Sequence, residues 1–235
     1  MDYLMDLHTH TIASGHAYST ISEMIDTAAQ KGLKLFGITE HAPAMPGTCN
    51  ELYYLNFRVI PRHQQGMQIL LGSEVNIIDL DGSMDFDDKM LDIMDLVIAS
   101  MHTPCLTPGS REENTRAYIN VMNHPKVTII GHPDDGRYPI NAEAFVKEAK
   151  ETKTVIEVNN NSLNPRGFRQ NSKENYKTIL KYCEKYEVPV VVNSDAHICY
   201  DVANFGYAKR FFQEIDFPKE LVLNFDVDVF LSYLK

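Results

Sequence analysis

Short apolar runs rich in β-branched residues recur along the chain, and stretches with helical periodicity separate them. The runs are nearly continuous in their hydrophobicity, as in Val190-Val191-Val192, which is typical of parallel strands buried on both faces. There are seven: Tyr3–His10, Leu33–His41, Met67–Asn76, Leu96–His102, Val127–Pro133, Thr154–Asn160 and Pro189–Asp195. This alternation predicts repeated βα units, and 235 residues is a suitable length for one βα barrel.

The helical stretches carry recognisable end signals. Thr20 and Glu23 can form a capping box at the start of the first helix, and Gly32 is suited to its end. Asp81-Gly82 predicts a tight turn after the third strand. Further helices are expected over Arg111–Asn123, Asn141–Lys153, Ser172–Tyr186 and Val202–Ile215. Because no linker or low-complexity segment interrupts this pattern, we expect a single domain over residues 1–235.

Composition narrows the class of partner. The formal net charge of −10 argues against extended nucleic acid, because proteins that bind it usually carry a basic stripe. Four scattered cysteines without a C-x-x-C pair argue against a disulfide framework and a thiolate zinc site. No stretch is long enough to span a membrane, and the first residues do not resemble a secretory signal. We therefore expect a cytoplasmic protein that acts on a small molecule.

Histidine and carboxylate side chains gather at the carboxyl ends of the predicted strands. Seven of the nine histidines lie there: His8, His10, His16, His41, His102, His132 and His197. Glu74 and Asp195 occupy equivalent places on the third and seventh strands. Because the carboxyl ends of barrel strands converge on one face, these nine side chains should meet.

Imidazole and carboxylate ligands without a thiolate suit a zinc site, with manganese or iron(II) as alternatives. His8 and His10 are two residues apart on a strand, so they project to the same side. The other two histidines are interpreted as ordinary hydrogen-bonded residues, because His63 lies in a stretch expected to be helical and His124 precedes Pro125.

Six short motifs, in order, resemble the polymerase and histidinol phosphatase (PHP) superfamily. They are Asp6-Leu7-His8-Thr9-His10, Ile38-Thr39-Glu40-His41, Gly72-Ser73-Glu74, Met101-His102, Gly131-His132-Pro133 and Ser194-Asp195-Ala196-His197. Three extended matches are most similar to the YcdX-type phosphatases: His16-Ala17-Tyr18-Ser19-Thr20, Lys34-Leu35-Phe36 and Glu157-Val158-Asn159-Asn160. The resemblance implies a distorted TIM-like (βα)7 barrel that holds three divalent metal ions. It also leaves open a homo-oligomer, such as a trimer.

Carried over to this sequence, the resemblance divides the ligands into three sets. The implied sets are His8, His10, Glu74 and Asp195 for one ion, His16, His41 and His197 for a second, and Glu74, His102 and His132 for a third. Glu74 then bridges two ions, and Glu74, Asp195 and His197 are the expected catalytic residues. Glu40 stands where related chains often carry aspartate, which removes no metal contact.

A site of this kind suits hydrolysis of a small phosphomonoester. Three divalent ions, two carboxylates and one hydroxide sum to a formal charge of about +3, which attracts a phosphate dianion. A hydroxide activated by the ions would attack phosphorus while the ions neutralise the phosphoryl oxygens. Candidate substrate contacts lie in the loops after the fifth and sixth strands: Arg137, Asn160, Arg166 and Arg169.

Two other functions fit the same residues. A nuclease that acts on phosphodiester ends would use the same metals, and it predicts cleavage of oligonucleotides with strongly salt-dependent binding. A regulatory module could hold the metals without catalysis, although the full set of expected ligands argues against it. Within the phosphatase interpretation, histidinol phosphate is one named substrate option.

Overall fold

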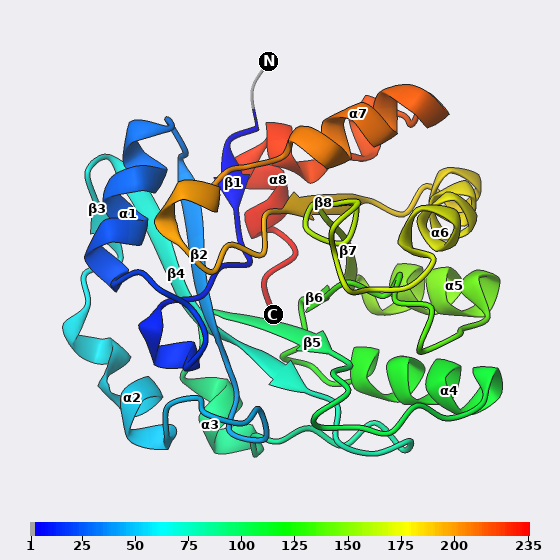
Figure 1. Ribbon diagram of the computed structural model, residues 1–235, viewed down its shortest axis with the longest axis horizontal. Helices are drawn as coiled ribbons and strands as arrows, with labels where there is room; N and C mark the ends of the chain where they lie inside the picture. Colours follow the sequence, from blue (N-terminus) through cyan, green and yellow to red (C-terminus); the bar gives the residue numbers. More distant parts are fainter. Residues whose placement is uncertain (1–2) are drawn as a thin grey trace.

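Seven parallel strands follow one another around the sheet in chain order (Figure 1). The computed structural model describes residues 3–235. The parallel strands are β1 (Met5–Asp6), β2 (Leu35–His41), β4 (Met67–Asn76), β5 (Leu96–Ser100), β6 (Ile129–Ile130), β7 (Val155–Asn159) and β8 (Val190–Asn193). The sheet curls into a nearly closed barrel, so the predicted α/β fold, a distorted TIM-like barrel of seven strands, is confirmed.

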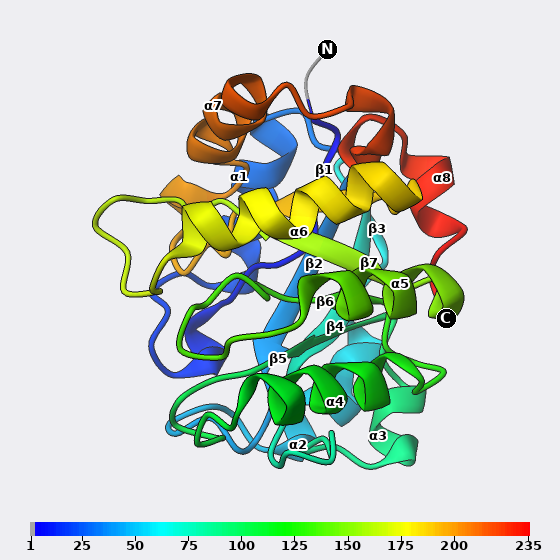
Figure 2. The same ribbon diagram turned by 90° about the vertical axis from the view of Figure 1, so that its right-hand side faces the viewer.

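Helices surround this sheet, and Figure 2 shows α4, α5 and α6 side by side along one flank. The α-helices are α1 (Ile21–Gln30), α2 (Glu51–Leu55), α3 (Asp88–Asp92), α4 (Arg111–Met122), α5 (Ala142–Thr152), α6 (Ser172–Tyr186), α7 (Gly206–Ile215) and α8 (Val227–Leu231). Short 3-10 helices are η1 (Ile12–Ser14), η2 (Asn56–Val59), η3 (Cys199–Asp201), η4 (Lys219–Leu221) and η5 (Leu223–Phe225). Within residues 3–235, no helix combines the length and apolar character needed to cross a membrane.

The expected capping box is present at the start of α1, where the Thr20 side chain accepts from the Glu23 backbone and Glu23 accepts from the Thr20 backbone. The prediction of a helical stretch around His63 is wrong. His63 lies in β3 (His63–Gln64), which pairs antiparallel with β4 through a turn at Gln65 and Gly66. Both turn residues have positive φ, 52° and 74°, which is the backbone of a tight hairpin rather than a helix.

The last predicted helix begins later than expected. Residues before Gly206 form η3 and an irregular segment in which Ala203 has a φ of 56°. The Ala203 backbone N–H donates to the buried Asp6 carboxylate at 2.8 Å. This tertiary hydrogen bond holds the segment against the barrel in a conformation that a helix does not allow.

Two apolar layers sandwich the sheet, because alternate strand residues point to opposite faces. The layer inside the barrel is Met5, Leu7, Leu35, Leu70, Leu96, Ile98, Ile129, Val155 and Val191, with Leu223 and Phe230 from the C-terminal segment. A larger layer packs between the outer face and the helices, and includes Phe36, Ile69, Val97, Ile156 and Val190. Burial on both faces explains why the strands read as continuous apolar runs.

The barrel closes at a seam between β1 and β8. Near the carboxyl ends, the Asp195 N–H donates to the His8 carbonyl at 3.0 Å and the His10 N–H donates to the Ala196 carbonyl at 2.9 Å. Toward the other end, the buried Asn224 side chain links the Met5 and Val192 backbones. These hydrogen bonds join the first and last strands of the barrel, so that His8 and Asp195 lie side by side.

Candidate metal centre

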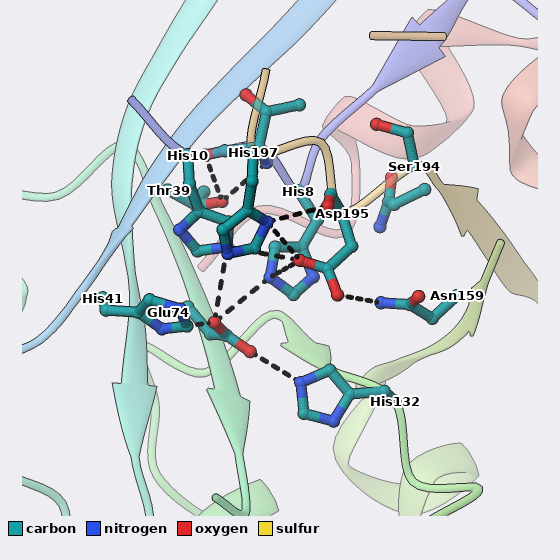
Figure 3. Close-up of polar contacts among 12 residues, drawn as sticks. His8, His10, Thr39, His41, Glu74, His132, Asn159, Ser194, Asp195 and His197 are labelled. Atoms are coloured by element: carbon teal, nitrogen blue, oxygen red, sulfur yellow. Dashed lines mark hydrogen bonds and ion pairs between the residues drawn. The ribbon is translucent and has the colours of Figure 1, made fainter. Parts of the chain in front are cut away.

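All nine side chains expected from the sequence converge at the carboxyl face of the barrel. Figure 3 shows, around a common centre, His8, His10, His41, Glu74, His132, Asp195 and His197. His8 and His10 follow β1, His41 ends β2, Glu74 lies near the end of β4, His102 follows β5, His132 follows β6, Asp195 and His197 follow β8, and His16 follows η1. Seven strand ends or loops therefore contribute to one cluster, as the topology of a barrel predicts.

Glu74 lies at the centre of the cluster, fully buried, and its two oxygens face different histidines. Its Oε2 atom lies 3.3 Å from His8 Nε2, 3.5 Å from His10 Nε2 and 2.8 Å from His41 Nδ1. Its Oε1 atom lies 3.2 Å from His102 Nε2 and 2.8 Å from His132 Nε2. This is the arrangement that a carboxylate bridging two metal ions requires.

Asp195 also divides its two oxygens. Its Oδ1 atom lies 3.8 Å from His8 Nε2, 3.5 Å from His10 Nε2 and 3.6 Å from His197 Nδ1. Its Oδ2 atom points away from these histidines and accepts from Asn159 and Arg169, each at 3.1 Å. One oxygen therefore faces the cluster, and protein donors occupy the other.

A second group of histidines lies beside the first. The Nε2 atoms of His16 and His197 are 3.1 Å apart, and the His16 and His41 rings stack with centroids 4.9 Å apart. Two imidazoles on one tetrahedral zinc, with Zn–N distances of about 2.0–2.1 Å, place their nitrogens about 3.3–3.4 Å apart. The separation of the His16 and His197 nitrogens is close to that value.

The donor atoms fit divalent cations. His8 Nε2, His10 Nε2, His41 Nδ1 and Glu74 Oε2 are buried and lack a hydrogen-bond partner. Buried polar atoms are normally paired, so four such atoms in one place need an explanation. Three sets of His and Glu donors lie within 4.8 Å of one another: His10 with His41 and His197, His8 with His10 and Glu74, and His41 with Glu74 and His102. Nitrogen and oxygen donors without sulfur suit zinc or a similar ion.

Outer hydrogen bonds fix which nitrogen three of the histidines present to the cluster. His8 Nδ1 donates to Glu157 at 2.8 Å, and His102 Nδ1 donates to the Asn76 side-chain oxygen at 2.8 Å. His10 Nδ1 donates to Ser14 Oγ at 3.1 Å. When these rings are neutral, each Nε2 atom is thereby left with a lone pair directed into the cluster, as in characterised metal sites.

The electrostatics keep the carboxylates ionised. Burial by itself would raise the pKa of Glu74, but the nearby His102, His8 and His41 outweigh burial and hold that pKa well below its usual range. Burial and the charges of His41 and His197 lower the pKa of His10 well below its usual value. Glu74 is therefore an anion and His10 a neutral imidazole at neutral pH, which are the forms that bind metal.

Two of the nine residues have strained backbones. His132 and Asp195 have positive φ values of 28° and 56°, which are uncommon for side chains other than glycine. Such conformations cost about 1–3 kcal/mol each and concentrate at functional sites. The two strained residues lie where the strands β6 and β8 lead into the loops that follow them.

The cluster lies beside a cavity of about 420 Å³. Its walls combine the metal-centre side chains with Met45, Met101, Thr103, Pro104, Asp135, Arg137, Asn161, Phe168 and Arg169. A larger hollow of about 510 Å³ lies near the starts of α4, α5 and α6, but it contains none of the nine cluster residues. The smaller cavity is therefore the candidate substrate site.

The PHP domain family model matches residues 6–194, which is most of the chain and spans seven of the nine cluster residues. The chain belongs to the PHP domain family. The family resemblance predicted from the six motifs is thus confirmed, whereas a particular closeness to YcdX-type phosphatases stays a prediction.

Relatives of this PHP chain are named as phosphatases. This chain is 46% identical to a probable phosphatase of Clostridium novyi over 235 residues, and the match covers 100% of this chain and 96% of the relative. It is 43% identical, with the same coverage, to a probable phosphatase of Acetivibrio thermocellus. Histidinol phosphate phosphatase from Lactococcus lactis, solved with zinc, L-histidinol and phosphate, has a TM-score of 0.64 at 17% identity, covering 93% of this chain and 95% of that one. The two curated relatives support a hydrolase of phosphoric esters, and the solved neighbour shares the fold.

The predicted substrate residues fall into two groups. Arg137 and Arg169 line the cavity, and both guanidinium groups lie over the ring of Phe168, at 5.4 Å and 5.2 Å from its centroid. Arg166 is exposed and is not among the residues that line the cavity. Asn160 Oδ1 accepts from the Tyr207 and Ala208 backbone N–H groups in the first turn of α7, at 2.9 Å and 3.1 Å. Substrate contact by any of the four stays a prediction.

Glu157 is not among the site residues predicted from the sequence, yet its buried carboxylate contacts four donors around the cluster. A signal was present, because Glu157 is a charged residue in the middle of an otherwise apolar strand. A buried carboxylate needs strong partners. Phe168 gave no comparable signal, since its place at the rim of the cavity depends on the conformation of a loop.

Proposed function

We propose that this PHP-family protein hydrolyses a small phosphomonoester at a centre of three divalent metal ions, with zinc as the first expectation and manganese or iron as alternatives. The observation that carries the proposal is the position of Glu74. Its two oxygens face two different groups of histidines beside a cavity of about 420 Å³. A single carboxylate placed in this way can link neighbouring ions.

The proposed ligand sets follow the family pattern. They are His8, His10, Glu74 and Asp195, then His16, His41 and His197, and then Glu74, His102 and His132. Support comes from the distances of 2.8–3.8 Å between Glu74 or Asp195 and the surrounding imidazoles. His41 also faces Glu74, which places it between the first and second sets.

Divalent ions in this position would activate water as a hydroxide and neutralise charge on the phosphoryl oxygens. The protein's own part is to hold the ligands in the required form. Glu157 keeps a proton on His8 Nδ1, and the Asn76 side-chain oxygen does the same for His102 Nδ1. Met45, Met101 and Pro104 form an apolar wall of the cavity, which limits the water that surrounds a bound phosphate.

Arg137 is the proposed contact for the phosphate or for the group that leaves. It lines the cavity, and Asp135 orients it through contacts to the Nε and Nη2 atoms. Its Nη1 atom is 3.5 Å from Thr103 Oγ1, a weak contact that a phosphate oxygen can replace. The Lactococcus lactis neighbour was solved with an amino alcohol and phosphate, which supports a small phosphomonoester such as histidinol phosphate as the substrate class.

The test combines metal analysis with a hydrolysis assay. Protein purified without chelator should contain zinc, manganese or iron and should release phosphate from a generic aryl phosphate. Dialysis against chelator should abolish the activity, and adding back the metal should restore it. E74Q and D195N should lose both metal and activity, whereas E184Q, at an exposed position on α6, should retain both.

Three results would contradict the proposal. Protein without bound metal that hydrolyses the aryl phosphate at the full rate would remove the metal centre from the reaction. Metal-loaded protein that hydrolyses no aryl phosphate but trims the ends of oligonucleotides would instead support a nuclease. Metal-loaded protein that is inactive on both would support a regulatory module.

A further inference from the structure

Arg169 is the buried cation beside the metal centre. It lies in the loop between β7 and α6, and its side chain is only 7% exposed. Its Nη2 atom donates to Asp195 Oδ2 at 3.1 Å, while its Nη1 atom donates to Ser162 Oγ at 3.2 Å and to Asn159 Oδ1 at 3.4 Å. Both terminal amino groups of the guanidinium are thus engaged by protein acceptors.

The contact to Ser162 extends this anchor to a second carboxylate. The Ser162 hydroxyl donates to the buried Asp134 Oδ1 at 3.1 Å, so its lone pairs are free to accept from Arg169. The guanidinium therefore connects the loop after β8, which carries Asp195, with the loop after β6, which carries Asp134. The Phe168 ring, 5.2 Å from the guanidinium carbon, covers it from one side.

These contacts of Arg169 determine how the Asp195 carboxylate is oriented. Arg169 and Asn159 occupy Oδ2, so only Oδ1 is directed toward the His8 and His10 imidazoles. A carboxylate without these two donors can rotate about its side-chain bonds and present its oxygens in several ways. The strained backbone at Asp195, with a φ of 56°, adds to the need for a side-chain anchor.

We propose that Arg169 is a positioning residue that fixes Asp195 as a one-oxygen ligand and thereby sets the affinity of the ion held with His8 and His10. This inference rests on the proposed metal centre. It differs from the role that the sequence predicts for Arg169, because a guanidinium that holds Asp195 and Ser162 is committed to the protein rather than to the phosphate. Outer partners of metal ligands typically change metal affinity by about 10- to 100-fold when they are removed.

The two roles predict different behaviour of two variants. R169M removes the charge and the hydrogen bonds but keeps a side chain of moderate length. R169K keeps the charge but cannot reach Asp195 and Ser162 at once with the planar geometry of a guanidinium. A residue that only attracts phosphate should tolerate lysine in part, whereas a residue that locks Asp195 in place should not.

The experiment measures zinc affinity rather than activity alone. Apo protein, prepared by dialysis against chelator, is titrated with zinc in competition with a chromophoric chelator. We expect R169M and R169K each to weaken one zinc site by about 10- to 100-fold. S162A, which removes one anchor of the guanidinium, should weaken the same site by a smaller factor. R58M, at an exposed arginine of η2, is the matched control and should bind zinc as the wild type does.

Aryl phosphate kinetics at saturating zinc complete the test. The proposal expects kcat to fall in R169M with KM changed little, because the misplaced ligand alters the centre rather than the phosphate contact. Unchanged zinc affinity in R169M together with a raised KM would overturn it and assign Arg169 to substrate. If R169M does not fold, S162A decides, and wild-type zinc affinity in S162A overturns the proposal. Wild-type protein that binds no zinc would instead refute the metal centre itself.

Discussion

Exchange of Glu157 for glutamine gives a quantitative prediction. The Glu157 carboxylate is fully buried, and each oxygen accepts two hydrogen bonds. Oε1 accepts from His8 Nδ1 at 2.8 Å and from Asn193 at 2.9 Å, while Oε2 accepts from the His132 backbone at 2.7 Å and from Asn159 at 3.1 Å. Glutamine has one oxygen, and its amide group must face the remaining two donors.

The size of the effect follows from the number of donors left without an acceptor. Each buried donor that loses its partner costs about 1–3 kcal/mol, so two such donors lower the free energy of unfolding by roughly 2–6 kcal/mol. If the amide faces His8, that ring must also move its proton from Nδ1 to Nε2. The atom directed at Glu74 would then be a donor instead of a metal ligand, and we expect zinc affinity to fall by about 10- to 100-fold.

Two measurements check this prediction. Urea unfolding of apo E157Q gives the loss of stability, and zinc titration against a chromophoric chelator gives the loss of affinity. E184Q, the exposed glutamate on α6, is the control and should match the wild type in both. An E157Q protein that unfolds at the wild-type urea concentration and binds zinc with wild-type affinity would contradict both expectations.

Further predictions concern the seam, one buried carboxylate and the metals. N224A should lower the free energy of unfolding by roughly 2–5 kcal/mol, because three hydrogen bonds to Met5 and Val192 across the barrel seam are lost. Urea unfolding measures this loss, and a change below about 0.5 kcal/mol would contradict it. Burial raises the pKa of Asp6 to about 6, from an ordinary 3.8, against hydrogen bonds from Ser194 and Ala203. Protonation of Asp6 therefore stabilises the folded state. This stabilisation is complete below pH 3.8 and is lost as the pH rises through about 6. Apo wild type should gain roughly 1 kcal/mol over D6N between pH 7.5 and 5, and an equal pH profile for both proteins in urea would count against it. Chelation of the metals should lower stability by about 2.7 kcal/mol for each site whose free ion stood at 100 times its Kd, seen as a drop in Tm, and an unchanged Tm would argue against bound metal in the native protein.

Much of the fold follows from the sequence because its signals are local. An apolar run of strand length, such as Val127–Pro133, identifies a buried strand without knowledge of its neighbours. The rule that barrel strands end on one face then places His8, Glu74 and Asp195 together, although they are far apart in the chain. The convergence of the metal-centre residues could therefore be predicted before any distance was known.

Other features depend on register and on loop conformation, which local patterns do not specify. The hairpin at His63 arises from two successive positive φ values, and a helical pattern in the residues does not exclude it. Asn160 lies in a loop that suits substrate contact, yet its side chain accepts from the start of α7. The delayed start of α7 likewise depends on a hydrogen bond to Asp6, which is almost two hundred residues away.

The sequence alone determined the kind of atoms at the site: imidazole nitrogens and carboxylate oxygens at the ends of parallel strands. Tertiary structure decided which atoms face one another. Only the closed seam between β1 and β8 brings His8 to Asp195, and only the packed loops direct Arg169 to Asp195 Oδ2 and Glu157 to His8 Nδ1. The physical reason is that strand periodicity is encoded over a few neighbouring residues, whereas a hydrogen bond between distant segments exists only once the whole barrel has closed.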